Sequence, residues 1–279
     1  MLVAAGSVSV LVGCSAVVGG GGSDGAGGRQ TPTSNASSAS AAAVTGDEFS
    51  GPAGSLPDSS IWTAETGAGG WGNHELQTYT ADNAVLDGSG HLVISAVIGG
   101  TAANPTYTSA RLTTAGKHSF TTGTLSARIK LPEGPGLLPA FWLLGSDVDQ
   151  VGWPAAGEID VVEAPHGTST SSHNIHGPNS SDMSEDVSVS ADVEHDTPLS
   201  RGYHVYSVTR TADSVTIRVD GKVANRLTRD TAPGDLAWVL DKPMDVLFSL
   251  AIGGDWPGAP TAATPATSTM TVDWVRLTE

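Results

Sequence analysis

Short alternating segments bounded by turn residues dominate the sequence from residue 46 onward. Apolar and polar side chains alternate along them, which is typical of strands with one buried face, and Gly, Asp, Pro and Asn separate them. No stretch of 12 residues has the 3.6-residue period of an amphipathic helix. Many short strands at this spacing predict an all-β sandwich or barrel. The expected strands include 91–98, 124–131, 158–163, 203–210, 214–219, 244–252 and 270–277.

One turn between expected strands can be assigned from its residues. Val219-Asp220-Gly221-Lys222 predicts a hairpin, because Asp-Gly tolerates the positive φ angles of a primed turn. The chain from residue 46 to residue 279 is long enough to bury a sizeable core as one domain.

The net charge of −16 excludes one class of partner. Phosphate neutralisation needs clusters of Lys and Arg, and the chain has only 13 such residues, so no nucleic acid partner is expected. A single Cys excludes an intramolecular disulfide and a multi-Cys zinc site. Residues 1–45 contain only Asp24 and Arg29 as charged residues, so the whole net charge belongs to residues 46–279.

The first 45 residues differ in kind from the rest. Leu2 to Val12 is an apolar run too short for a spanning helix, and residues 1–13 are predicted to be a signal segment. The run ends in Leu11-Val12-Gly13-Cys14, which resembles a bacterial lipobox, so Cys14 is predicted to be lipidated. No Lys or Arg precedes the run, and an ordinary signal peptide with an incidental Cys is the alternative.

The segment from Cys14 to residue 45 is rich in Gly, Ser, Ala and Thr. It cannot bury enough apolar surface to offset its ordering entropy, so it is predicted to be a flexible linker. The expected location is therefore extracellular, with the protein held by a lipid at the outer face of the cell membrane.

Three carboxylates crowd into Gly157-Glu158-Ile159-Asp160-Val161-Val162-Glu163. On a strand Glu158 and Asp160 share one face, whereas Glu163 lies at an odd offset from Glu158 and returns to that face only through a one-residue β-bulge. Like charges raise at least one pKa, as a general acid near neutral pH requires. The alternative is a solvent-facing edge strand with scattered acids.

Aromatic residues lie both before and after these acids in the sequence. Trp142 and Trp153 precede the carboxylates, and Trp256 follows in Asp255-Trp256-Pro257. Exposed rings beside carboxylates suit the apolar faces and hydroxyl groups of sugars. For Trp238 and Trp274 a position in the core is expected instead.

Together these segments resemble glycoside hydrolase family 16, and within it the bacterial laminarinases, which are endo-β-1,3-glucanases. The resemblance covers the chain from about Asp47 to its end, in the family's order. Its pieces are Asp47-Glu48-Phe49, Trp71-Gly72-Asn73-His74-Glu75-Leu76-Gln77-Thr78-Tyr79, Thr108-Ser109-Ala110-Arg111, Ala127-Arg128-Ile129-Lys130-Leu131-Pro132, Pro139-Ala140-Phe141-Trp142, the 158–163 block, His176-Gly177, Gly253-Gly254-Asp255-Trp256-Pro257 and Val272-Asp273-Trp274-Val275.

The resemblance implies a jelly-roll (concanavalin-like) sandwich of two antiparallel sheets with a concave catalytic cleft. It implies hydrolysis with retention, with Glu158 as nucleophile, Glu163 as acid/base and Asp160 as the residue that tunes the pair. In this family laminarinases, agarases and carrageenases share the bulged motif, whereas lichenases and xyloglucan transglycosylases lack the extra residue. The implied substrate-binding residues are Asn73, Glu75, Arg111, Trp142, Trp153, His176 and Trp256.

Some of these positions have a structural alternative. His176 could instead make a structural hydrogen bond, and Arg111 a salt bridge. Two residues depart from the family pattern, since Leu138 and Arg210 stand where the family usually has Trp. The change at Leu138 is expected to weaken a sugar subsite, and the change at Arg210 to affect packing.

Many relatives hold a structural calcium ion, and no cofactor is expected for catalysis itself. Carried over, the ion's ligands are the backbones of Glu48 and Gly90 and the side chain of Asp273, and oxygen ligands suit calcium. The alternative is that Asp273 caps a strand end.

The leading hypothesis is an endo-glucanase acting on β-1,3-glucan as a monomer, with a polysaccharide as its partner. The same chemistry on a galactan or agarose, or transglycosylation, stays open. A non-catalytic β-glucan-binding protein is disfavoured because such family members have lost the catalytic glutamates, and both are present here.

Overall fold

The computed structural model describes residues 46–278. The predicted signal segment 1–13, the predicted lipidation site Cys14 and the linker up to residue 45 lie outside the described residues, and those predictions stay untested. No helix within residues 46–278 is long and apolar enough to cross a membrane.

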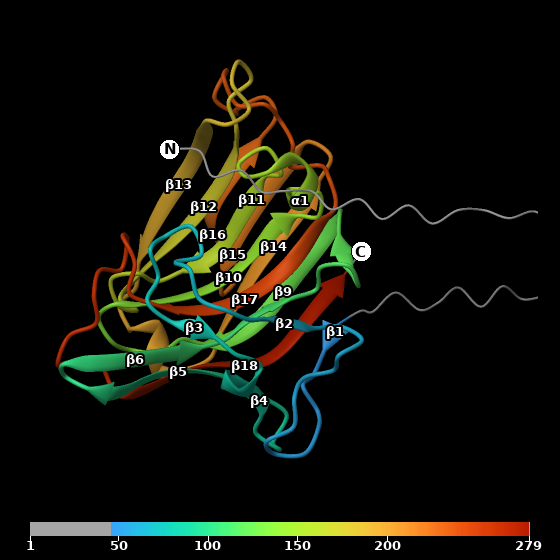
Figure 1. Cartoon of the computed structure of the whole chain (residues 1–279). Coiled ribbons are helices and arrows are strands. Elements are labelled where there is room, and N and C mark those ends of the chain that lie inside the picture. The colour runs from blue at the N-terminus through green and yellow to red at the C-terminus, as the bar shows by residue number, and fades with distance from the viewer. Residues whose placement is uncertain (1–45, 279) are drawn as a thin grey trace, which may run out of the picture. The chain divides into compact units, whose positions relative to one another are not determined.

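Within residues 46–278 the strands form two sheets, which Figure 1 shows as stacked layers. The ten-stranded sheet has the order β16 (Lys222–Thr228), β15 (Ser214–Val219), β14 (His204–Thr211), β9 (Gly123–Lys130), β18 (Thr267–Thr278), β5 (Leu92–Thr101), β6 (Asn104–Ser109) and β3 (Thr78–Tyr79), with β1 (Gly46–Asp47) beside β18 and β4 (Ala84–Leu86) beside β5. The eight-stranded sheet has the order β13 (Asp186–Glu194), β12 (Thr170–Pro178), β11 (Glu158–Glu163), β10 (Leu137–Gly145), β17 (Met244–Ile252), β7 (Arg111–Thr113) and β2 (Thr63–Glu65), with β8 (Ser119–Phe120) beside β17. The helices are short: α1 (Val148–Val151) and the 3-10 turns η1 (Ala81–Asn83) and η2 (Leu199–Arg201).

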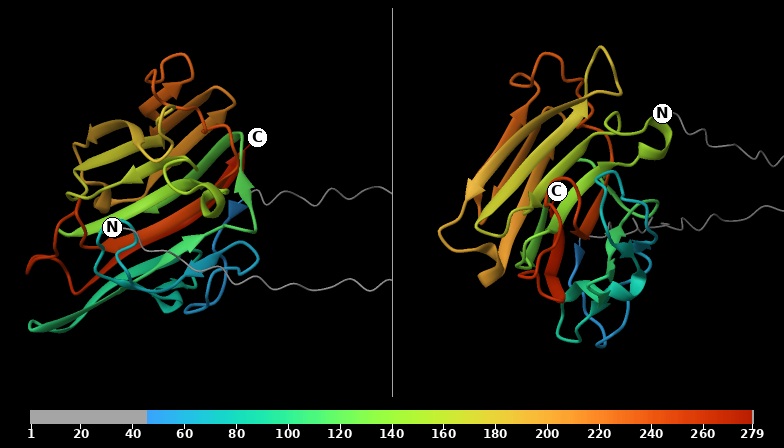
Figure 2. Two further views of the ribbon diagram at one scale, coloured as in Figure 1. Left: turned by 45° about the horizontal axis from the view of Figure 1, so that its top comes forward. Right: turned by 60° about the vertical axis from the view of Figure 1, so that its left-hand side comes forward.

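The core lies between the sheets because alternate side chains of each strand point inward. Phe141 on β10 stacks on Phe248 on β17 with ring centroids 5.0 Å apart, and both are fully buried. From the other sheet, Ile129 of β9 and Val272 of β18 join the same cluster. Strands β12 and β13 lie against β16, and β11 lies against β14 (Figure 2). The predicted all-β sandwich is confirmed.

Strand β11 is central in its sheet, between β10 and β12. The alternative of a solvent-facing edge strand is therefore wrong. Its register with β12 shifts between Asp160 and Glu163, which confirms the predicted bulge.

The seven expected strands all form, with ends that differ by up to three residues, and the predicted hairpin turn has φ of 47° at Asp220 and 78° at Gly221. Strand β10 was not among the expected strands. Its residues are apolar on both faces and almost all buried, so it lacks the two-residue period.

Of the two tryptophans expected in the core, Trp238 packs against the core cluster, whereas Trp274 does not belong to it. Trp238 and Trp274 are only partly buried; Arg229 lies over the ring of Trp238, and Arg276 over the ring of Trp274. Arg210 is fully buried, and its guanidinium donates to the carbonyls of Phe120, Leu240 and Lys242. Arg210 thus lies in the interior and does not line the cleft.

Candidate active site

A cleft of about 590 Å³ lies on the outer face of the eight-stranded sheet. Its floor comes from the outward-facing side chains of β10, β11, β12 and β17, and the loop 71–75 and Trp256 contribute to its walls. Every predicted catalytic and substrate-binding residue lines this cleft: Asn73, Glu75, Arg111, Trp142, Trp153, Glu158, Asp160, Glu163, His176 and Trp256.

The bulge in β11 decides which carboxylates meet. Glu158 pairs with His176 and Asp160 with Asn174, but Glu163 pairs with Ser172, so one extra residue is accommodated between them. Glu163 thereby returns to the face of Glu158 and Asp160. Asn174 Nδ2 then donates to Glu163 Oε2 over 2.9 Å and fixes the orientation of that carboxyl group.

Burial and neighbouring charges raise the pKa values of the three carboxyl groups. Burial raises the pKa of Glu158 to about 8, and the neighbouring charge of Asp160 adds to this effect. Burial also raises the pKa of Glu163 well above its usual range, with the charges of Asp160 and then Glu158 adding to it. The cluster therefore holds a proton at neutral pH, and Glu163 is repelled by both of its neighbours.

His176 links Asp160 to a carboxylate behind it. Its Nδ1 lies 2.9 Å from Asp186 Oδ2, and its Nε2 lies 3.4 Å from Asp160 Oδ2, a buried atom that has no hydrogen-bond partner among residues 46–278. Ligand atoms of Glu158, Asp160 and His176 lie within 4.8 Å of one another, so this group could hold a metal ion. Two carboxylates and an imidazole backed by Asp186 suit a metal such as zinc.

Arg111 makes the salt bridge considered for it and also lines the cleft. Its Nε donates to Glu65, so the salt bridge forms, and its guanidinium still lines the cleft between two rings. The guanidinium carbon lies 4.6 Å from the ring centre of Trp142 and 5.1 Å from that of Trp71. Trp142 itself is only 9% exposed, and its Nε1 donates to Ser249 over 3.1 Å. Both side chains are therefore held rigidly at the floor of the cleft.

The side chains at the rim differ in exposure. Trp153 and Trp256 are 51% and 39% exposed, so each presents an open ring face beside the carboxylates. Glu75 instead accepts hydrogen bonds from Gln77 and from the Tyr79 hydroxyl at 3.0 Å, and burial raises its pKa. The Asn73 side chain accepts from the backbone of Asp255 over 3.2 Å, which ties the loop 71–75 to the segment that carries Trp256.

Three contributors to the site were not predicted. Asn174 was missed, although it lies two residues before His176 on the same strand, and that spacing could have revealed it. Trp71 belongs to a quoted motif but was not assigned to the site. The contact of His176 with Asp186 depends on the pairing of β12 with β13, for which the sequence carries no local signal.

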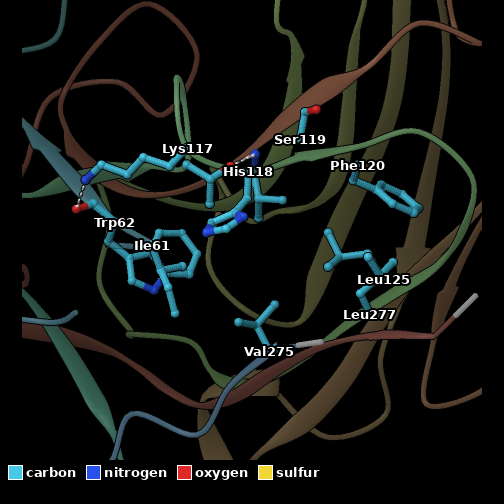
Figure 3. A pocket seen from close by; sticks show the side chains of 12 residues that line it. Ile61, Trp62, Lys117, His118, Ser119, Phe120, Leu125, Val275 and Leu277 are labelled. Atoms are coloured by element: carbon cyan, nitrogen blue, oxygen red, sulfur yellow. Dashed lines mark hydrogen bonds between the residues drawn. The ribbon is translucent and has the colours of Figure 1, made fainter. Parts of the chain in front are cut away.

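A second, smaller pocket of about 280 Å³ lies between the two sheets and is mostly apolar. Figure 3 shows Ile61, Trp62, Leu125, Val275 and Leu277 around it. The lysine that lines it, Lys117, donates to the carbonyls of Ser59 and Trp62. The pocket contains none of the predicted site residues, and its lining carries no carboxylate.

The residues proposed for calcium lie near one another. The Glu48 carbonyl is 3.8 Å from where a Cβ on Gly90 would be, and Asp273 lies next to His91. However, one oxygen of Asp273 accepts from Arg128, and the other lies 3.8 Å from His91 Nε2. A calcium ion would have to share this carboxylate with two basic groups. The calcium site stays a prediction, and an unchanged melting temperature after chelation would remove it.

Comparison with known proteins agrees with this geometry. The model of the family "Glycosyl hydrolases family 16" matches residues 70–276. A "Glucan endo-1,3-beta-glucosidase A1" of Niallia circulans is 33% identical over 83% of this chain, which spans only 37% of that protein. A "Beta-glucanase" of Rhodothermus marinus is 34% identical over 84% of each chain. The crystal structure of an endo-beta-1,3-glucanase from Pyrococcus furiosus superposes with a TM-score of 0.74 at 38% identity, covering 84% of this chain and 92% of that one.

Proposed function

The chain belongs to glycosyl hydrolase family 16, and we propose that it is a retaining endo-glycosidase that hydrolyses β-1,3-glucan. The observation that carries the proposal is the bulge in β11, which sets Glu163 beside Glu158 and Asp160 on the floor of an open cleft. Membership of the family implies a polysaccharide substrate. The linkage is proposed from the relatives, one of which is named as a glucan endo-1,3-beta-glucosidase.

In the proposed reaction Glu158 attacks the anomeric carbon while Glu163 protonates the departing glycosidic oxygen. Water then cleaves the glycosyl-enzyme ester, and Glu163, now ionised, takes the proton from that water. These roles require Glu158 to ionise before Glu163. Burial and the charge of Asp160 raise the pKa values of both glutamates. Arg111 favours the ionised form of Glu158, and the charge of Glu158 adds to the repulsion at Glu163, which supports this order.

The cleft also supplies groups that suit sugars. The open ring faces of Trp153 and Trp256 offer flat apolar area, and Asn73, Glu75 and His176 offer polar atoms beside them. Leu138 lines the same cleft where the family usually has Trp, so we expect one subsite to bind its sugar more weakly than in relatives.

Two measurements test the proposal. Reducing-sugar release should be highest on laminarin among laminarin, lichenan, agarose and galactan, and activity confined to agarose would overturn the substrate. Proton NMR of the first product should show the β-anomer, since a retaining enzyme keeps the configuration of the bond it cleaves.

The two glutamate roles have their own test. Glu158→Gly with azide should give a glycosyl azide of inverted configuration, because azide fills the space of the missing nucleophile. If Glu163→Gly gives that product instead, the two roles are reversed.

We also propose that the protein is extracellular and anchored through a lipid on Cys14. The support is the sequence Leu11-Val12-Gly13-Cys14 alone. Incorporation of a labelled acyl chain that Cys14→Ala abolishes is the expected result, and label that persists in this variant would contradict the anchor.

A further inference from the structure

A fully buried histidine lies directly behind the bulge in β11. His173 is on β12, one residue before Asn174, and its side chain points into the sandwich rather than into the cleft. The register pairs Asp160 with Asn174 and Glu163 with Ser172, so His173 alone faces the two residues between them, Val161 and Val162. It therefore occupies the position opposite the extra residue of the bulge.

The imidazole bonds to the backbone carbonyl of Val161, which the bulge takes out of the regular pattern of hydrogen bonds between strands. His173 Nδ1 lies 2.7 Å from the Val161 carbonyl oxygen. A carbonyl can only accept, so Nδ1 carries the proton and donates it. An unsatisfied carbonyl at this fully buried position would be costly, because no water reaches it.

Two further side chains, Ser171 and His195, keep the His173 imidazole in this tautomer. His173 Nε2 lies 2.8 Å from Ser171 Oγ, and Ser171 Oγ lies 2.8 Å from His195 Nε2. Since His173 Nε2 is the acceptor, the Ser171 hydroxyl donates to it and accepts from His195. Asn225 Nδ2 anchors the backbone of the same residue by donating to the His173 carbonyl over 2.8 Å.

The surroundings favour a neutral imidazole. Burial lowers the pKa of His173, and it also lowers the pKa of His195. The charged groups that face this chain of hydrogen bonds are Asp192 near His173, and His204, Asp220, Glu194 and Lys222 around His195. Asp192 lies close to the bulge, because the hydroxyl of Ser172, the partner of Glu163, donates to it over 2.7 Å. The other four groups lie at the His195 end, where a small surface pocket opens.

We propose that His173 is a positioning residue for Glu163: its Nδ1–H holds the Val161 carbonyl in the bulge, and Ser171 and His195 fix the required tautomer. Without that bond β11 can relax toward a regular strand, which would turn Glu163 away from the cleft. Glu158 and Asp160 precede the bulge and keep their pairing with His176 and Asn174. This inference rests on the proposed function, in which Glu163 is the general acid.

The test uses the dependence of rate on the leaving group. A dinitrophenyl laminaribioside needs no proton from Glu163, whereas a phenyl laminaribioside and laminaritetraose do. His173→Leu should lower kcat/KM on the last two by about 10²-fold or more and on the dinitrophenyl substrate by much less. His173→Asn places an amide donor near the position of Nδ1, so it should recover part of the loss.

A second pair of variants covers the case in which His173→Leu fails to fold. Ser171→Ala removes the group that fixes the tautomer and should give a smaller loss with the same dependence on the leaving group. Ser109→Ala is the matched control, because that serine is equally buried but its hydroxyl has no hydrogen-bond partner within the described part of the chain. This variant should leave kcat/KM unchanged on both kinds of substrate.

The outcomes separate the two proposals. Equal losses on all substrates, or His173→Asn no better than His173→Leu, would overturn the positioning role. A wild-type enzyme inactive on every laminarin-type substrate would instead contradict the proposed function. In that case ¹⁵N NMR of the wild-type imidazoles still decides the structural part, since a His173 proton on Nε2 rather than Nδ1 overturns it.

Discussion

A single buried carboxyl group in the cleft can serve activity and at the same time lower the stability of the fold. Glu158 has a pKa near 8 in the folded chain, far above the ordinary value of 4.5, chiefly because it is buried. Between these two pH values the folded protein holds a proton that the unfolded chain has lost. Folding free energy is therefore lost as pH rises through this window.

Glu158→Gln should remove that penalty together with the activity. We expect its Tm to exceed that of the wild type at pH 8 by roughly 2–4 °C, for about 1 kcal/mol, and to differ much less at pH 4.5. Calorimetry at the two pH values measures this. The same Tm difference at both would mean that burial of the charge is not the cause. Glu185→Gln, at an exposed position that does not line the cleft, serves as the control.

Arg210 affects stability without contributing to the cleft. Its guanidinium is fully buried and donates to three backbone carbonyls, over 2.7 Å to Leu240 and 2.6 Å to Lys242. Arg210→Leu leaves these carbonyls unsatisfied and should cost about 3 kcal/mol, or roughly 6–12 °C in Tm. kcat/KM measured well below Tm should not change. Arg226→Leu, an exposed arginine on β16, should leave both unchanged. A loss of activity in Arg210→Leu at low temperature would show that Arg210 also shapes the cleft.

At the level of elements, the two-residue period predicted strands that have one buried face. It succeeded for β14 and β18 for this reason, and also for the fully buried β17, whose Asp245 and Ser249 mark the outward face. It failed for β10, which forms part of the cleft floor and has no hydrophilic residue on either face. The bulge could be predicted because three acids with an odd spacing imply it. Its support by His173 could not be predicted, since it depends on side chains that three different strands or loops bring together.

The bulge itself can be removed by deleting Val161. Strand β10 pairs Trp142 with Asp160 and Phe141 with Val162, and β12 skips a residue at the same place, so Val161 is the extra residue on both sides. Its deletion restores an even spacing between Glu158 and Glu163 and leaves a regular ladder. Glu163 should therefore stay in the cleft.

We expect the Val161 deletion to keep activity on laminaritetraose within the roughly 10²-fold that a misplacement of about 1 Å costs, at a lower Tm because a buried side chain is lost. In this background His173→Leu should no longer discriminate between leaving groups, which a double-mutant cycle measures. A deletion variant that loses all activity yet keeps its fold by circular dichroism would show that the bulge does more than set the direction of Glu163.

At the scale of the whole molecule, the charge of −16 is concentrated on the domain that carries the cleft. The site could be predicted in outline because its motifs are local, but the field around it is a property of the entire surface. A neutral glucan does not respond to this field, whereas an anionic polymer is repelled as it approaches. The protein should therefore prefer uncharged polysaccharides at low ionic strength.

Salt tests this preference, because at 0.1 M ionic strength charges interact over only about 10 Å. On laminarin, KM should stay constant as sodium chloride is raised from low concentration, since neither kcat nor binding involves a charged substrate. On a carboxymethylated β-1,3-glucan, KM should start higher and fall severalfold over the same range, with kcat nearly unchanged. Equal salt responses on the two polymers would mean that the net charge of the domain does not make the electrostatic potential in the cleft negative. Local cations such as Arg111 would then offset it there.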